Sequence, residues 1–160
     1  MPDLAQLNAL PTADATGLLL GCCAAPGWAR RVVAGRPYRT LGELLAAADA
    51  TWAGREPGDL AAAMAGHPRI GERGLSGPSR QEQAGVGAGT RTLAGLRAAN
   101  EAYEQRFGHV FLICASGRGP GDILAELHQR MANDPGTELT VAAAEIGKIN
   151  ALRLRQLVGQ

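Results

Sequence analysis

The chain has 160 residues, of which 46% are hydrophobic and 19% charged, and this composition is typical of one globular domain with a buried core. Its 16 basic and 15 acidic residues give a net charge of +1, which excludes the basic surface expected of a nucleic-acid-binding protein. The longest apolar stretch, residues 18–25, is far shorter than the roughly 20 residues that span a bilayer. We therefore expect one domain over residues 1–160, with neither a nucleic-acid nor a membrane partner.

The first part of the chain predicts a series of short helices. Pro11 separates the first two, with Thr12 as the N-cap of the second, and Pro26 suits the first position of the third. Thr40 followed by Glu43 has the capping-box spacing that begins a fourth helix. The predicted helices cover residues 4–10, 13–22, 26–32, 41–52 and 57–65.

A long loop follows these helices. Four glycines and two prolines within residues 66–78 exclude a stable helix there. Loops of this length in a compact domain are uncommon and often functional. Ser79 and Glu82 then have the spacing that begins another short helix.

The second half of the chain continues with longer helices. In the stretch 90–107, apolar and amphipathic residues recur every three or four positions, which predicts an amphipathic helix. The positions on this face are Leu93, Leu96, Asn100, Tyr103 and Phe107. Residues 109–115 read as an extended segment packed between helices, because no strand partner is evident. Two further helices are expected near 121–132 and 136–157, so the whole is an all-α, single-domain bundle of about eight or nine helices with one long Gly/Pro-rich loop.

His67 is the first candidate for chemistry. A histidine can donate or accept a proton near neutral pH, and Pro68 restricts the backbone of His67 to extended angles, which helps to aim the imidazole. The alternative is a loop histidine bonded to a main-chain carbonyl.

Ser79 and Glu82 also allow two readings. Their spacing explains them as a helix cap, which satisfies N–H groups at the helix end. The same helix end would suit an anionic ligand, with the Glu82 carboxylate orienting a hydroxyl or ureide.

Arg153 shares a helix face with Ile146 and Ile149, whereas Arg155 falls on the opposite face. A guanidinium on an apolar face needs an anionic or carbonyl partner, because leaving it unpaired there is costly. That partner is either a structural acidic residue or a planar ligand such as a carboxylate or amide.

No resident metal or disulfide is expected. Cys22, Cys23 and Cys114 are an odd set without ligand spacing, so we expect them to be small buried side chains in a reducing compartment. His109 and His128 could join His67 and Glu82, but no pair has the spacing of metal ligands.

An ordered set of motifs resembles the 2-oxo-4-hydroxy-4-carboxy-5-ureidoimidazoline (OHCU) decarboxylase family over nearly the whole chain. The motifs are LNALP near the N-terminus, HPRIGER at 67–73, SRQEQAG at 79–85, Asn100-x-x-Tyr103-x-x-x-Phe107-Gly108, FLICA at 111–115, Arg130-x-x-Asn133-Asp134 and Glu145-Ile146-x-Lys148-Ile149-x-x-x-Arg153-Leu154. Each motif is weak alone, but their order is specific.

The resemblance implies a cofactor-free, all-helical carboxy-lyase that acts last on the route from urate to (S)-allantoin. It implies that His67 is the proton donor, with Glu82 as the second catalytic group. The substrate-binding positions that it implies are Pro68, Ser79, Arg80, Gln81, Glu82, Gln83, Phe111, Leu112, Ile113, Cys114, Ala115 and Arg153. No metal ligand is implied.

The resemblance also implies a homodimer, and the C-terminal residues 157–160 lack a peroxisomal signal, which suits a bacterial cytoplasm. Three alternatives stay open. The chain could be a family member that binds a ureide such as allantoin without turning it over, a metal-dependent hydrolase, or a helical interaction module.

Overall fold

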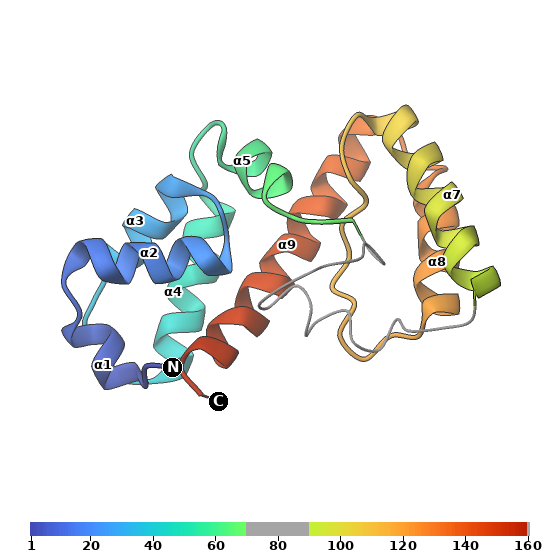
Figure 1. Cartoon of the computed structure of the whole chain (residues 1–160). Coiled ribbons are helices and arrows are strands. Elements are labelled where there is room, and N and C mark those ends of the chain that lie inside the picture. The colour runs from blue at the N-terminus through green and yellow to red at the C-terminus, as the bar shows by residue number, and fades with distance from the viewer. Residues whose placement is uncertain (70–89, 160) are drawn as a thin grey trace. The chain divides into compact units, whose positions relative to one another are not determined.

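The computed structural model describes residues 1–69 and 90–159, and in these residues it contains eight helices and no strand. The helices are α1 (Leu4–Ala9), α2 (Thr12–Cys22), α3 (Pro26–Ala34), α4 (Leu41–Ala53), α5 (Asp59–Ala65), α7 (Thr90–Phe107), α8 (Pro120–Arg130) and α9 (Pro135–Leu157) (Figure 1). The predicted all-α fold is confirmed. The long loop beyond Arg69 and the short helix expected at Ser79 lie outside the described residues.

The helix starts depend on local chemistry, and some differ from the prediction. Pro26 is at the start of α3 as expected. Thr12 is not an N-cap, because α2 already includes it and follows Pro11 without a side-chain cap. At α4, the Thr40 hydroxyl accepts from the Glu43 N–H as predicted, but the Glu43 carboxylate accepts from Arg39 N–H rather than closing the capping box.

α5 begins two residues later than predicted. Gly58 precedes it with a φ of 88°, a left-handed conformation that suits glycine and breaks the helix between Pro57 and Asp59. α8 and α9 each begin one residue earlier than predicted, at a proline. A proline suits the first turn of a helix, because an N–H group at that position would have no partner within the helix.

The contacts divide the chain into two compact units, each with its own core. Unit 1 consists of residues 1–66 with 147–160, and unit 2 consists of residues 67–146. A single domain over the whole chain stays a prediction. α9 contributes residues to both.

In unit 1, α3 packs against α2, α4 and α5. Trp28 of α3 is fully buried and its indole N–H donates to the Ala48 carbonyl of α4 at 3.1 Å. Asn8 fixes the N-terminal helix, because its side-chain amide exchanges two hydrogen bonds with the main chain of Tyr38. The start of α3 is held by Asp59, whose carboxylate accepts from the Gly27 N–H at 3.3 Å.

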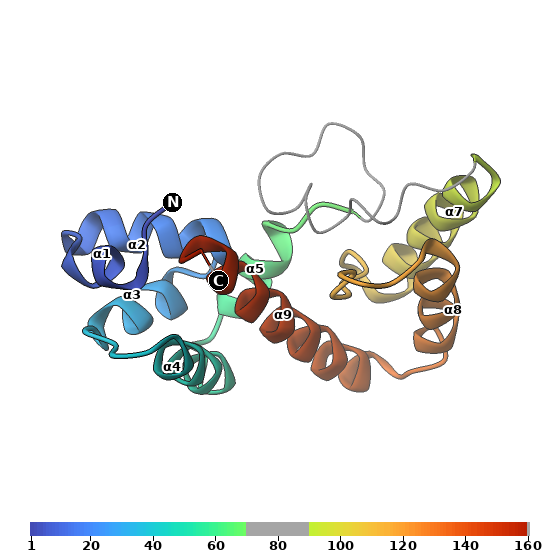
Figure 2. The same ribbon diagram turned by 90° about the horizontal axis from the view of Figure 1, so that it is seen from below.

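In unit 2, α7 and α8 lie side by side (Figures 1 and 2) and enclose a core with the segment that follows α7. The predicted face of α7 is confirmed, because Leu96, Asn100 and Tyr103 are all buried. The core cluster consists of Leu96, Ala99, Tyr103, Phe111, Ile113, Ala115, Ile123 and Leu127. Residues 110–115 are neither helix nor strand, in agreement with the predicted segment between helices.

None of the helices in residues 1–69 and 90–159 has both the length and the apolar character needed to cross a membrane.

Candidate active site

The described residues of the predicted site fall in both units. His67, Pro68 and the segment 111–115 belong to unit 2, whereas Arg153 belongs to unit 1. Residues 79–83, which include Glu82, lie outside the described residues. The pairing of His67 with Glu82 therefore stays a prediction.

His67 directly follows Gly66, the residue that ends α5. A Cβ at Gly66 would lie 2.7 Å from the Cβ of Ala24, so only glycine lets the end of α5 approach Ala24 this closely. The His67 side chain is buried, with 9% of its surface exposed. Two residues later, Arg69 donates from Nε to the Glu104 carboxylate of α7 at 2.8 Å. This ion pair attaches the chain around His67 to unit 2.

The segment 111–115 is held through both its side chains and its main chain. Phe111, Ile113 and Ala115 point into the core cluster of unit 2, and Cys114 is half-buried. The Leu112 carbonyl accepts from Arg130 Nη1 at 2.7 Å, and the Cys114 N–H donates to Glu145 Oε1 at 3.1 Å. The structure thus brings the predicted segment together with two charged side chains that the sequence reasoning did not assign to the site.

Arg130 is itself fixed by a buried network. Its Nε donates to Glu138 Oε1 at 2.7 Å, and its guanidinium lies over the ring of Phe111, 4.5 Å from the ring centroid. The Glu138 carboxylate also accepts from the Tyr103 hydroxyl at 2.6 Å and from Asn133 Nδ2 at 3.0 Å. A buried carboxylate is tolerated only when hydrogen-bond donors surround it, and here three side chains provide them.

The network determines the charge of Glu138. Burial alone would raise the pKa of its carboxyl, but the hydrogen bonds from Arg130, Tyr103 and Asn133 outweigh it, and the pKa lies below the ordinary value. For Tyr103, burial and then the bond to Glu138 raise the pKa of the hydroxyl. At neutral pH the network is therefore an ionised pair with a neutral tyrosine.

Arg153 lies on α9, with 7% of its surface exposed, on the same face as buried Ile146 and Ile149. Arg155 is exposed, so the predicted division of the helix into two faces is confirmed. Arg153 Nη1 donates to the Cys22 carbonyl at the end of α2 at 2.9 Å. A guanidinium is a planar fork of five N–H donors, and this shape matches planar ligands such as carboxylates and amides.

The thiol of Cys23 is close to Arg153 and Asp59. Burial raises its pKa to about 11, and the nearby Asp59 charge adds to this while the Arg153 charge opposes it. Cys22 and Cys23 are buried, as predicted, whereas Cys114 is half-buried. Because the nucleophilic form of cysteine is the thiolate, Cys23 is not suited to nucleophilic chemistry at neutral pH.

Glu138 and Glu145 were missed as residues that organise the site, although a signal for them exists. They occupy the same stripe of α9 as Ile146, Ile149 and Arg153, at spacings of three, four or seven residues. Carboxylates on a buried stripe require partners, as the arginine does. Their partners are distant in the sequence, so the stripe alone does not reveal what they hold.

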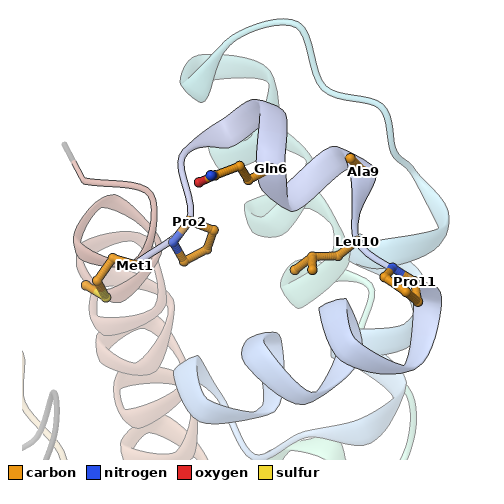
Figure 3. Close-up of a pocket in the computed structure, with 6 residues that line it drawn as sticks. All are labelled: Met1, Pro2, Gln6, Ala9, Leu10 and Pro11. Carbon is orange, nitrogen blue, oxygen red and sulfur yellow. The ribbon is translucent and has the colours of Figure 1, made fainter.

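Two other kinds of site, a metal site and a pocket, add little to the predicted active site. Across residues 1–69 and 90–159, no group of three His, Cys, Asp or Glu side chains is placed to hold a metal ion. A pocket of about 510 Å³ lies at the N-terminal end of unit 1 (Figure 3), and none of the predicted site residues lines it. Its lining is Met1, Pro2, Gln6, Ala9, Leu10 and Pro11.

Known proteins give an independent comparison. The family model described as OHCU decarboxylase matches residues 8–155, a range that includes every predicted site residue. A uric acid degradation bifunctional protein of Arabidopsis thaliana is 30% identical over 145 residues, which are 85% of this chain and 45% of the plant protein. A 2-oxo-4-hydroxy-4-carboxy-5-ureidoimidazoline decarboxylase of Amia calva is 33% identical over 100 residues, which are 58% of this chain and 57% of the relative. The chain thus spans about half the length of these curated relatives.

A solved structure is similar as well. The crystal structure of an OHCU decarboxylase in the presence of (S)-allantoin matches with a TM-score of 0.76 and 32% sequence identity. The match covers 88% of this chain and 96% of that one.

Proposed function

Because the chain belongs to the OHCU decarboxylase family, we propose that it removes CO2 from 2-oxo-4-hydroxy-4-carboxy-5-ureidoimidazoline and releases (S)-allantoin. The observation that carries the proposal is the match over residues 8–155, because one continuous alignment includes His67, Glu82, the segment 111–115 and Arg153. The burial of the His67 and Arg153 side chains supports it further.

The chemistry needs orientation and a proton rather than an electron sink from a cofactor. The bond from the ring carbon to the carboxylate breaks, CO2 leaves, and the electron pair is held by the conjugated imidazoline ring as an enolate-like species. A proton then adds to that carbon. The chain's tasks are to hold the carboxylate out of the ring plane and to stabilise the developing charge.

Each predicted residue has a part in this scheme. Arg153 and main-chain N–H groups of residues 79–83 and 111–115 hold the ring and the ureide. Glu82 and His67 bind the hydroxyl and fix the carboxylate. His67 then delivers the proton from one face, so that the allantoin formed has one handedness.

Circular dichroism during urate breakdown tests the activity directly. Urate oxidase and hydroxyisourate hydrolase generate the unstable substrate in the cuvette, with and without this protein. We expect a fast rise of the (S)-allantoin signal in its presence. A slow drift equal to the protein-free control would contradict the proposal and leave a family member that binds a ureide without converting it.

His67→Ala tests the assigned proton donor. One well-placed acid contributes about 10²–10⁴-fold, so we expect the variant to lose turnover by that factor while its far-ultraviolet spectrum stays helical. His128→Ala is the matched control, because that histidine is exposed on α8. Turnover near that of the unmodified chain in His67→Ala would remove His67 from its role.

A homodimer is part of the same proposal and rests on the family resemblance. Light scattering on the purified chain tests the dimer, and a mass of one chain at micromolar concentration would contradict it.

A further inference from the structure

Two charged side chains hold the main chain of the segment 111–115 at positions two residues apart. Arg130 donates to the Leu112 carbonyl at 2.7 Å, and Glu145 accepts from the Cys114 N–H at 3.1 Å. Arg130 is 5% exposed and Glu145 is 4% exposed, and the bond from Arg130 is buried while the bond to Glu145 is partly buried. Buried charge-assisted hydrogen bonds are stronger than those between neutral groups, which makes these two contacts effective anchors.

The two anchors hold the main chain on both sides of Ile113. The Leu112 carbonyl precedes this residue in the chain and the Cys114 N–H follows it, so Arg130 and Glu145 together fix the main chain between them. The side chains of Phe111 and Ile113 are buried in the core cluster, which prevents the segment from rotating.

Arg130 is rigid because the Glu138 network surrounds it. Its guanidinium bonds to Glu138 and packs on Phe111, which is itself the first residue of the segment. The same arginine thus contacts the segment twice, by its Nη1 at Leu112 and by its face at Phe111. A surface ion pair would not achieve this, because exposed pairs are mobile and screened.

We propose that Arg130 and Glu145 are positioning residues for the decarboxylation, which fix the register of residues 111–115 and hold the main chain of this segment in place for the substrate. The inference rests on the proposed function, in which this segment binds the ring and the ureide. Neither side chain has to touch the substrate, because each acts through the main chain. A shift of the segment along its own direction by part of one residue would move its main-chain N–H groups out of hydrogen-bond range of the substrate.

The test compares Glu145→Ala with Glu145→Gln, because glutamine keeps an oxygen that can accept from Cys114. We expect kcat/KM to fall at least tenfold in Glu145→Ala, with more of the loss in KM than in kcat, since the segment contacts the substrate before and during reaction. Glu145→Gln should restore most of it. Glu101→Ala, at an exposed glutamate of α7 in the same unit, should leave both constants unchanged.

Amide hydrogen exchange supplies a readout that does not depend on activity. Exchange of the Cys114 N–H should become at least tenfold faster in Glu145→Ala, while the amide of core residue Leu127 stays protected. If Glu145→Ala does not fold, Arg130→Lys makes the same test at the other anchor. A lysine is a point charge that cannot hold Glu138 and the Leu112 carbonyl together, so the same fall in kcat/KM is expected.

The outcomes distinguish a failure of the positioning role from a failure of the proposed function. A folded Glu145→Ala variant that keeps kcat/KM within twofold, in an active enzyme, overturns the positioning role alone. Unchanged exchange at Cys114 overturns it as well. An inactive unmodified protein overturns the proposed function and, with it, the positioning role.

Discussion

Arg153 illustrates how a single residue can serve structure and ligand together. One of its N–H groups bonds to the Cys22 carbonyl, and the side chain is buried on the apolar face of α9. The main-chain bond fixes the direction of the guanidinium before any ligand arrives. An arginine oriented in this way loses less entropy on binding a planar anion than a mobile one would.

Arg153→Lys should therefore reduce activity although the charge is kept. A lysine lacks the planar fork with which an arginine bonds two acceptors side by side, and a lost hydrogen bond to a charged group is worth about 1.5–3 kcal/mol, which is roughly a 10- to 100-fold fall in kcat/KM. Steady-state kinetics on the coupled assay measures this fall. Arg155→Lys on the exposed face of α9 is the control. An unchanged kcat/KM for Arg153→Lys would assign Arg153 a structural role only.

At the scale of elements, the start of α3 depends on a glycine. Gly27 is buried, and its N–H bonds to Asp59 of α5. A Cβ built on Gly27 would overlap the end of the Glu56 side chain and would lie 2.7 Å from Asp59 Oδ2, closer than real Cβ atoms come to a neighbour. By contrast, Gly17 within α2 has no atom within 4 Å of its added Cβ and is exposed.

Gly27→Ala and Gly17→Ala should change stability in opposite directions. The first displaces Asp59 from its hydrogen bond and should lower the free energy of unfolding by about 1–3 kcal/mol. Gly17→Ala replaces glycine, which has a low helix propensity, and should raise the free energy of unfolding by up to about 1 kcal/mol. Urea unfolding followed by circular dichroism gives both values. Equal effects of the same sign would show that the close approach at Gly27 is not rigid.

The helices could be predicted from sequence wherever the signal is local. Pro26 and Thr40 mark helix starts, and the spacing of Leu96, Asn100 and Tyr103 identifies the buried face of α7. The errors are at helix ends where backbone conformation decides, as at Gly58, whose positive φ delays α5. A short polar residue near a proline, such as Thr12, is not sufficient to identify a cap.

The candidate site could be predicted only in part. The sequence predicts His67 and Arg153 as site residues because of their residue types and positions. It predicts the segment 111–115 because this segment belongs to an ordered set of motifs. The roles of Arg130 and Glu145 could not be predicted, because their partners are distant in the sequence. Leu112 lies 18 positions from Arg130, and Cys114 lies 31 positions from Glu145. Such contacts depend on how helices pack, and periodicity in one helix carries no information about its neighbour.

For the molecule as a whole, the Glu138 network makes stability depend on pH. The folded state lowers the pKa of Glu138 below its ordinary value of 4.5, so the carboxylate stabilises the fold at neutral pH. This stabilisation is present above the pKa of the unfolded chain. It is lost as the pH falls through the lower pKa of the folded state.

Glu138→Gln should remove this dependence. At pH 7 the variant leaves Arg130 as an uncompensated buried charge, which costs about 3–5 kcal/mol, and the difference from the unmodified chain should shrink steadily below about pH 4.5. Thermal unfolding between pH 3 and pH 7 measures the difference. Glu126→Gln, at a half-exposed partner of Arg118, should cost at most about 1 kcal/mol at any pH. A constant difference across this pH range for Glu138→Gln would contradict the assignment.

Unit 2 is inserted in the chain between the two stretches that form unit 1. On the ribosome, unit 1 therefore cannot be completed until its second stretch, residues 147–160, has been synthesised. At about 5–20 residues per second this wait lasts several seconds, during which the apolar surface that these residues cover is open to water and to chaperones. The half of the molecule that is made first is thus the last to be completed.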